Sequence, residues 1–135
     1  MTGLYIIPPA GFTPDSVTQC LQTHVDPQSG QADFHGIRLD SAKEGDKLMA
    51  EIKAESEQKY PGEWKEENIT ASGSHPAKLY RYMFMGTVGR IIGYRLYFTD
   101  DFSRYMLEAN YDIGYAKGNE MYLVMKTLVI KTHSN

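Results

Sequence analysis

The strongest constraint on the fold of this chain is a run of three tyrosine-rich segments between residues 79 and 110. The segments read LYRYMFM, IIGYRLYF and SRYMLEAN, and each one alternates large apolar residues with polar ones. Alternation with a period of two is typical of half-buried antiparallel strands. Two connections, residues 86–90 and 99–101, separate the segments. The sequence therefore predicts a three-stranded antiparallel meander.

The alternation also divides the side chains of the meander between the two faces of a sheet. On one face we expect core residues, namely Tyr82, Phe84, Leu96, Phe98 and Leu107. The other face is then expected to carry six arginine, methionine and tyrosine side chains: Arg81, Arg95, Arg104, Tyr97, Met83 and Met106. Because side chains alternate along a strand, a slip of one residue would move an arginine to the opposite face.

The rest of the chain predicts two helices and further strands. Residues 46–59 and 119–129 both place apolar side chains at helical spacing. Strands are predicted at residues 4–7, 34–39 and 64–70. Residues 15–25 fit a short helix or an extended segment equally well. This order of elements predicts one α+β domain over residues 1–135, with a mainly antiparallel sheet of about five or more strands and helices packed on one face.

Composition and charge narrow the classes of partner. The net charge of −3 gives no overall positive field, so we expect no nucleic-acid partner. No apolar run approaches the roughly 20 residues of a membrane-spanning helix. Cys20 is the only cysteine, which excludes an internal disulfide. The start, MTGLYIIPPAGF, does not resemble a signal peptide, so the sequence as written predicts a cytoplasmic protein. An exported protein from which the signal had been removed would have the same sequence, so export remains the alternative.

The order of elements resembles a known superfamily. A short strand leads into prolines and a Gly-Phe pair (IIPPAGF), and an amphipathic helix follows (DKLMAEIKAESEQKY). Then come a Pro-Ala turn (GSHPA), the aromatic meander and a closing helix (NEMYLVMKTLVIKT). This layout resembles the superfamily of the PsbP extrinsic subunit of photosystem II and the Mog1 nuclear-import factor. The resemblance implies an α+β fold and binding to another protein, and it assigns no residue a catalytic role.

Residues with catalytic or metal-binding chemistry are scattered along the chain. The four histidines contain no pair with the spacing of metal ligands. Cys20 and His24 would share a face only if residues 15–25 were helical, and no third residue would orient them. The glycine-rich residues 86–90 and the pair Asp100–Asp101 are explained by hairpin turns. We therefore expect no catalytic residue, no cofactor and no metal.

The three arginines of the meander are the most suggestive group. Guanidinium groups beside Met and Tyr side chains suit the surface of a protein partner. The alternative is a face that is merely solvated, or one covered by a helix with the arginines paired to Glu108 and other acids.

From these features we expect a protein-binding domain without catalysis, an accessory or chaperone-type factor for a secreted or membrane-associated partner. Two other functions fit the sequence. One is a small-ligand-binding protein or enzyme with a pocket between sheet and helix, and the other is a cytosolic immunity protein that neutralises a toxin.

Overall fold

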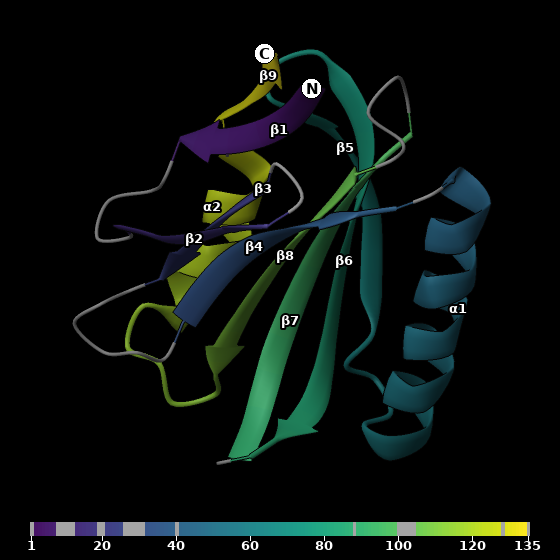
Figure 1. The fold of residues 1–135 in the computed structure, drawn as a ribbon. Coiled ribbons are helices and arrows are strands. Elements are labelled where there is room, and N and C mark those ends of the chain that lie inside the picture. Colours follow the sequence, from purple (N-terminus) through teal and green to yellow (C-terminus); the bar gives the residue numbers. More distant parts are fainter. Residues whose placement is uncertain are drawn as a thin grey trace.

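Most of the chain is described by the computed structural model. The described residues are 2–7, 13–18, 21–25, 32–39, 41–87, 89–99, 105–127 and 129–134. Within these residues, seven strands form one antiparallel sheet in the order β2-β3-β4-β8-β7-β6-β5 (Figure 1). The strands are β2 (Thr13–Thr18), β3 (Leu21–Val25), β4 (Ala32–Arg38), β5 (Lys65–Ala71), β6 (His75–Gly86), β7 (Gly89–Phe98) and β8 (Tyr105–Asp112).

A second, two-stranded antiparallel sheet joins the beginning and the end of the chain. It pairs β1 (Thr2–Ile7) with β9 (Val129–Ser134). The predicted fold class, α+β with an antiparallel sheet, is confirmed, and the predicted meander is β6-β7-β8.

In the part of the chain that the structure describes, two α-helices lie on opposite faces of the large sheet (Figure 1). They are α1 (Ala42–Lys59) and α2 (Met121–Thr127), and a short 3-10 turn, η1 (Gly118–Glu120), leads into α2. Met49 of α1 belongs to the same core as Tyr97, whereas Met121 of α2 belongs to the core of Leu96. Leu96 and Tyr97 are neighbours in β7, so their side chains point to opposite faces. The expectation that both helices pack on one face is therefore corrected, and the sheet is covered on both sides.

α1 begins at Ala42, four residues before the predicted start, and Ser41 is its N-cap. The Ser41 Oγ accepts a hydrogen bond from the backbone N–H of Glu44 at 3.2 Å. A Ser followed three residues later by Glu satisfies N–H groups that the first turn of a helix leaves unpaired. At the other end the backbone N–H of Tyr60 donates to the Ser56 carbonyl at 2.8 Å. Gly62 follows with a φ of +86°, a conformation that favours glycine.

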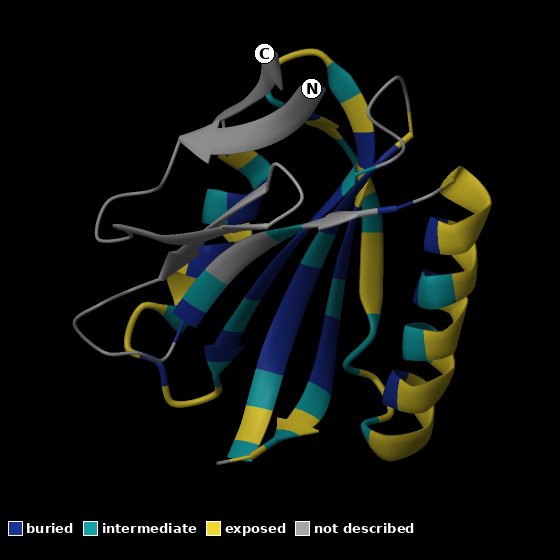
Figure 2. Ribbon diagram, viewed as in Figure 1, coloured by how far each residue is buried: buried dark blue, intermediate teal, exposed yellow. Residues whose placement is uncertain are grey.

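Two hydrophobic cores lie on either side of the meander, and Figure 2 shows buried residues concentrated along its strands. The larger core faces α2 and includes Leu79, Leu96, Phe98, Leu107, Met121 and Met125. The smaller core faces α1 and consists of Leu39, Met49, Tyr80, Tyr97 and Met106. Four of the five predicted core residues are buried, namely Tyr82, Leu96, Phe98 and Leu107. Phe84 is half-buried, and the expectation that all five share one face is wrong, because Tyr82 and Phe84 lie on the α1 face and the other three on the α2 face.

The ambiguous segment, residues 15–25, contributes to two strands. β2 and β3 pair there as an antiparallel hairpin, so the extended alternative holds. The helical face that would bring Cys20 and His24 together is therefore not formed; Cys20 itself lies outside the described residues. Asp100–Asp101 lies outside them too. Gly86 pairs with Gly89, which confirms the hairpin expected at residues 86–90.

Candidate functional site

The pairing of β6 with β7 separates two of the predicted site residues. Tyr80 lies opposite Arg95, and Arg81 lies opposite Tyr94. Directly opposed side chains of an antiparallel pair share a face. Arg95 therefore lies on the α1 face and Arg81 on the α2 face. The expected sharing of one face by these arginines is wrong, because β6 is offset by one residue from the assumed alignment.

The other predicted site residues do not form an exposed patch either. Met83, Tyr97 and Met106 are buried, with 6%, 3% and 0% of their surface exposed. Tyr97 lies under the start of α1, where its hydroxyl donates to the Ala42 carbonyl at 2.6 Å. Arg104 lies outside the described residues. The expectation of exposure fails because each face of the meander is covered by a helix of the same chain.

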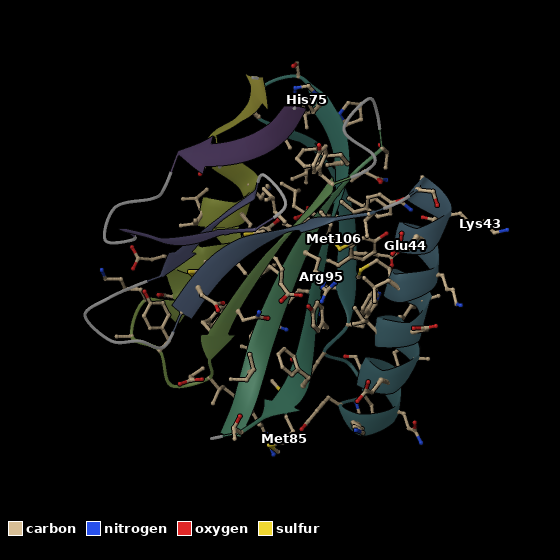
Figure 3. The ribbon with its side chains drawn as sticks, in the orientation of Figure 1. Lys43, Glu44, His75, Met85, Arg95 and Met106 are labelled. Atoms are coloured by element: carbon tan, nitrogen blue, oxygen red, sulfur yellow. The ribbon has the colours of Figure 1, made fainter. Side chains whose placement is uncertain are left out.

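Arg95 is the centre of a buried polar network on the α1 face (Figure 3). Glu108 lies directly opposite it on β8 and forms an ion pair with its guanidinium group. The Arg95 Nε donates to the Tyr82 hydroxyl at 2.8 Å, and the Asn110 amide donates to Glu108 at 2.8 Å. The side chains of Arg95 and Glu108 are only 13% and 10% exposed. The network matches the alternative in which a helix covers the arginine and an acid pairs with it.

The Tyr82 hydroxyl remains protonated at neutral pH. Burial raises the pKa of Tyr82 to about 12; the nearby Arg95 cation works against this rise and Glu108 adds to it. A phenol in this state can donate to Glu108 while it accepts from Arg95. The hydrogen bonds therefore join the two charged groups and one neutral group, and they position all three side chains.

A cleft opens between the C-terminal half of α1 and the sheet. Its volume is about 350 Å³, and its lining includes Ile52, Ser56, Tyr82, Phe84, Arg95 and Glu108. At its N-terminal half α1 sits close to the sheet, because a Cβ on Gly45 would come within 2.9 Å of the Tyr97 ring. The Ser56 hydroxyl is buried in the cleft wall and has no hydrogen-bond partner. Glu55 and Lys59, an ion pair of 2.9 Å, lie at its edge.

Arg81 occupies a second cavity, on the α2 face, of about 400 Å³. Its NH1 lies 3.0 Å from a carboxylate oxygen of Glu63. Burial alone would lower the pKa of Arg81, but Glu63 and the hydroxyls of Tyr94 and Tyr111 raise it overall. Two acidic and two basic side chains line this cavity, so its charges are compensated within the chain; they are Lys65, Glu66, Glu67 and Arg81.

A row of three exposed side chains crosses the hairpin end of the meander on the α2 face. Met85 lies directly opposite Arg90, and the backbone N–H of Ile113 donates to the Arg90 carbonyl at 3.1 Å on the other side. Met85 and Ile113 are 60% and 55% exposed, and Arg90 is exposed between them. Figure 3 shows Met85 at this end of the sheet. We call Met85, Arg90 and Ile113 the sheet-end row.

Sequence reasoning missed Ser56 and the sheet-end row. Ser56 could have been found, because it follows Gly45, Met49 and Ile52 at the spacing of one helix face. Arg90 and Ile113 lie at strand ends, where alternation gives little guidance. The fact that these two residues lie side by side follows only from the strand register.

The described parts of the chain contain no group of three or more His, Cys, Asp or Glu side chains that could hold a metal ion. Among the helices of those parts, none has the length and apolar character needed to cross a membrane. Comparison with known proteins gives no match: no family model, curated protein or solved structure is significantly similar to the chain. The resemblance to the PsbP and Mog1 superfamily stays a prediction.

Proposed function

We propose that this protein is a protein-binding domain that acts without a catalytic centre of its own. The observation that supports this function is the sheet-end row, in which two exposed apolar side chains flank an exposed arginine. Arg and Met are enriched in protein interfaces, and arginine is among the residues that most often dominate the binding energy. A large apolar side chain on the surface gains free energy when a partner covers it.

The row also indicates the chemistry of the partner surface. The guanidinium carbon of Arg90 lies 5.9 Å from the centre of the Tyr60 ring, and this contact limits the conformations of the arginine side chain. A side chain that is already ordered loses less entropy on binding. We infer that the partner presents a carboxylate to Arg90 and apolar side chains to Met85 and Ile113. From the sequence, we propose that the protein is an accessory or chaperone-type factor and that its partner is secreted or membrane-associated.

The test compares capture of a partner by variants of the row and by a matched control. Ile113→Asp and Arg90→Glu change the row, whereas Leu123→Asp places the same charge on α2, where Leu123 is 64% exposed. We expect one protein to be captured by the parent and by Leu123→Asp but not by the row variants. With that partner purified, each row variant should weaken binding by about tenfold or more.

All three variants alter exposed side chains, so their melting temperatures should stay close to that of the parent. A captured partner that binds the row variants as tightly as the parent would contradict this interface.

A further inference from the structure

The cleft between α1 and the sheet has the dimensions of a small-molecule site. Its volume of about 350 Å³ lies within the range of roughly 300–1,000 Å³ for ligand pockets. Ile52 of α1 and Phe84 of β6 supply apolar walls. The space exists because α1 presents the small Ser56 to the sheet at this level, where a larger side chain would fill the gap.

The polar groups of the cleft have unused hydrogen-bonding capacity. The Ser56 hydroxyl is buried without a partner, and such a group costs free energy until it is hydrogen-bonded. Arg95 carries five N–H donors, and its hydrogen bonds and ion pair engage Tyr82, Glu108 and the sulfur of Met106, which is a weak acceptor. An oxygen atom brought into the cleft would therefore meet donors that need an acceptor.

The charges that line the cleft sum to zero. Arg95 pairs with Glu108, and Lys59 pairs with Glu55. A carboxylate or ammonium group entering the cleft would be desolvated without a free counter-charge, which is costly. A ligand that carries an uncharged oxygen avoids this cost.

We propose that this cleft binds a small, uncharged and mainly apolar molecule that carries a carbonyl or hydroxyl oxygen. The oxygen accepts from Ser56 and Arg95, and the apolar part lies between Ile52 and Phe84. Met85 lines this cleft and also belongs to the sheet-end row, but the ligand contacts proposed here are made by other residues, and Arg90 and Ile113 do not line the cleft. The two proposals therefore stand on different observations, and either one can fail without the other.

The test uses three probes of similar length that differ in their polar end: methyl pentyl ketone, hexanoate and hexylammonium. Trp64 is the only tryptophan and its ring lies 6.2 Å from that of Tyr82, so its fluorescence reports on the cleft. We expect the ketone to quench or shift this fluorescence saturably, with a Kd on the order of 1 mM or lower. Hexanoate and hexylammonium should bind about tenfold more weakly or worse.

Variants of α1 locate the binding. Ser56→Leu fills the cleft and should abolish binding of the ketone, whereas Ala54→Leu adds a leucine on the exposed side of the same helix and should leave binding unchanged. Ser56→Ala keeps the space but removes the hydroxyl, and it should weaken binding by about two- to tenfold. Saturable binding that Ser56→Leu leaves intact would overturn the proposal, as would the absence of saturable binding to the parent protein.

Amide chemical shifts of the parent protein provide a test that does not depend on whether Ser56→Leu folds. The ketone should shift the amide resonances of Ser56 and Phe84 and leave that of Ala71, at the far end of the sheet, in place. The reverse pattern would place the ligand elsewhere and refute the assignment.

Discussion

The ring of Tyr82 lies over Gly93, its directly opposed partner across β6 and β7. A Cβ at residue 93 would come within 2.6 Å of the ring carbon that bears the hydroxyl, closer than real contacts allow. Glycine at this position lets the ring lie flat against β7, so that the hydroxyl reaches Arg95. The polar network of the α1 face therefore depends on the lack of a side chain at Gly93.

We expect Gly93→Ala to destabilise the protein by about 1–3 kcal/mol, because the methyl group must displace a buried ring. Urea denaturation measures the change. Gly114→Ala is the matched control, since no atom lies within 4 Å of its added Cβ, and it should change stability by less than about 0.5 kcal/mol. In a Tyr82→Ala background the cost of Gly93→Ala should largely disappear. A cost that persists there would mean that the ring is not its cause.

Replacing one partner of the Arg95–Glu108 pair should cost more than replacing both. Arg95→Met leaves the Glu108 carboxylate buried without its cation, and this should destabilise the protein by about 3–5 kcal/mol. The double variant Arg95→Met with Glu108→Leu should recover most of that loss, because apolar side chains of similar size can replace a buried ion pair. Both are measured by denaturant unfolding.

Lys59→Met is the control for this pair, because the Lys59–Glu55 ion pair lies on the surface and should matter little. If the single Arg95 variant were as stable as the parent, the pair would not be shielded as the structure describes it.

Stability should fall between pH 10 and pH 12 because of buried tyrosines. Burial raises the pKa values of Tyr80, Tyr82 and Tyr111 from 10.0 to about 12. The folded state therefore favours the protonated phenols. Their contribution to the free energy of unfolding is fully present below the pKa of the unfolded state, and it is lost as the pH rises through the pKa of the folded state. For Tyr82 alone the loss is roughly 2–3 kcal/mol.

Thermal unfolding across this pH range tests the expectation, together with the absorbance of tyrosinate. Tyr82→Phe should show a shallower decline than the parent, because one shifted phenol is missing. An identical decline in both proteins would show that Tyr82 does not titrate as expected.

The two phenylalanines at the ends of the meander should differ in their contribution to stability. Phe98 is completely buried in the α2-side core, and Phe98→Ala should cost about 3–5 kcal/mol. Phe84 is half-buried beside the cleft, so Phe84→Ala should cost clearly less. Equal costs, measured by denaturant unfolding, would mean that Phe84 is packed more tightly than the structure describes.

Local sequence patterns were sufficient for the strands of the meander and for both helices. Alternation over ten residues marks a strand, and apolar spacing with a terminal Pro61-Gly62 marks α1, because these signals depend only on neighbouring residues. The relative alignment of β7 and β8 was also correct, since Leu96 faces Leu107 and Arg95 faces Glu108.

The alignment of β6 could not be read from its own sequence. Leu79, Tyr80, Tyr82 and Met83 are all buried, although they point to both faces. When both faces of a strand are buried, its sequence does not alternate between apolar and polar residues. The sequence then does not indicate which side chains point to which face. The predicted site is wrong for the same reason: an arginine in a strand usually indicates the solvent face, whereas here Arg95 is shielded by α1 and paired with Glu108.

The buried Arg95–Glu108 pair has a consequence for how many structures this chain can adopt. A one-residue shift of β8 against β7 would move Glu108 to the face that holds Leu96 and Phe98, where no arginine opposes it. The same shift would bring Asn110 to that apolar face and carry Leu107, Ala109 and Tyr111 away from it, so the polar side chains of β8 and the loss of the ion pair both oppose the second alignment. The apolar double variant removes the charged part of this opposition, so we expect it to regain its melting temperature while its amide spectra become more heterogeneous than those of the parent.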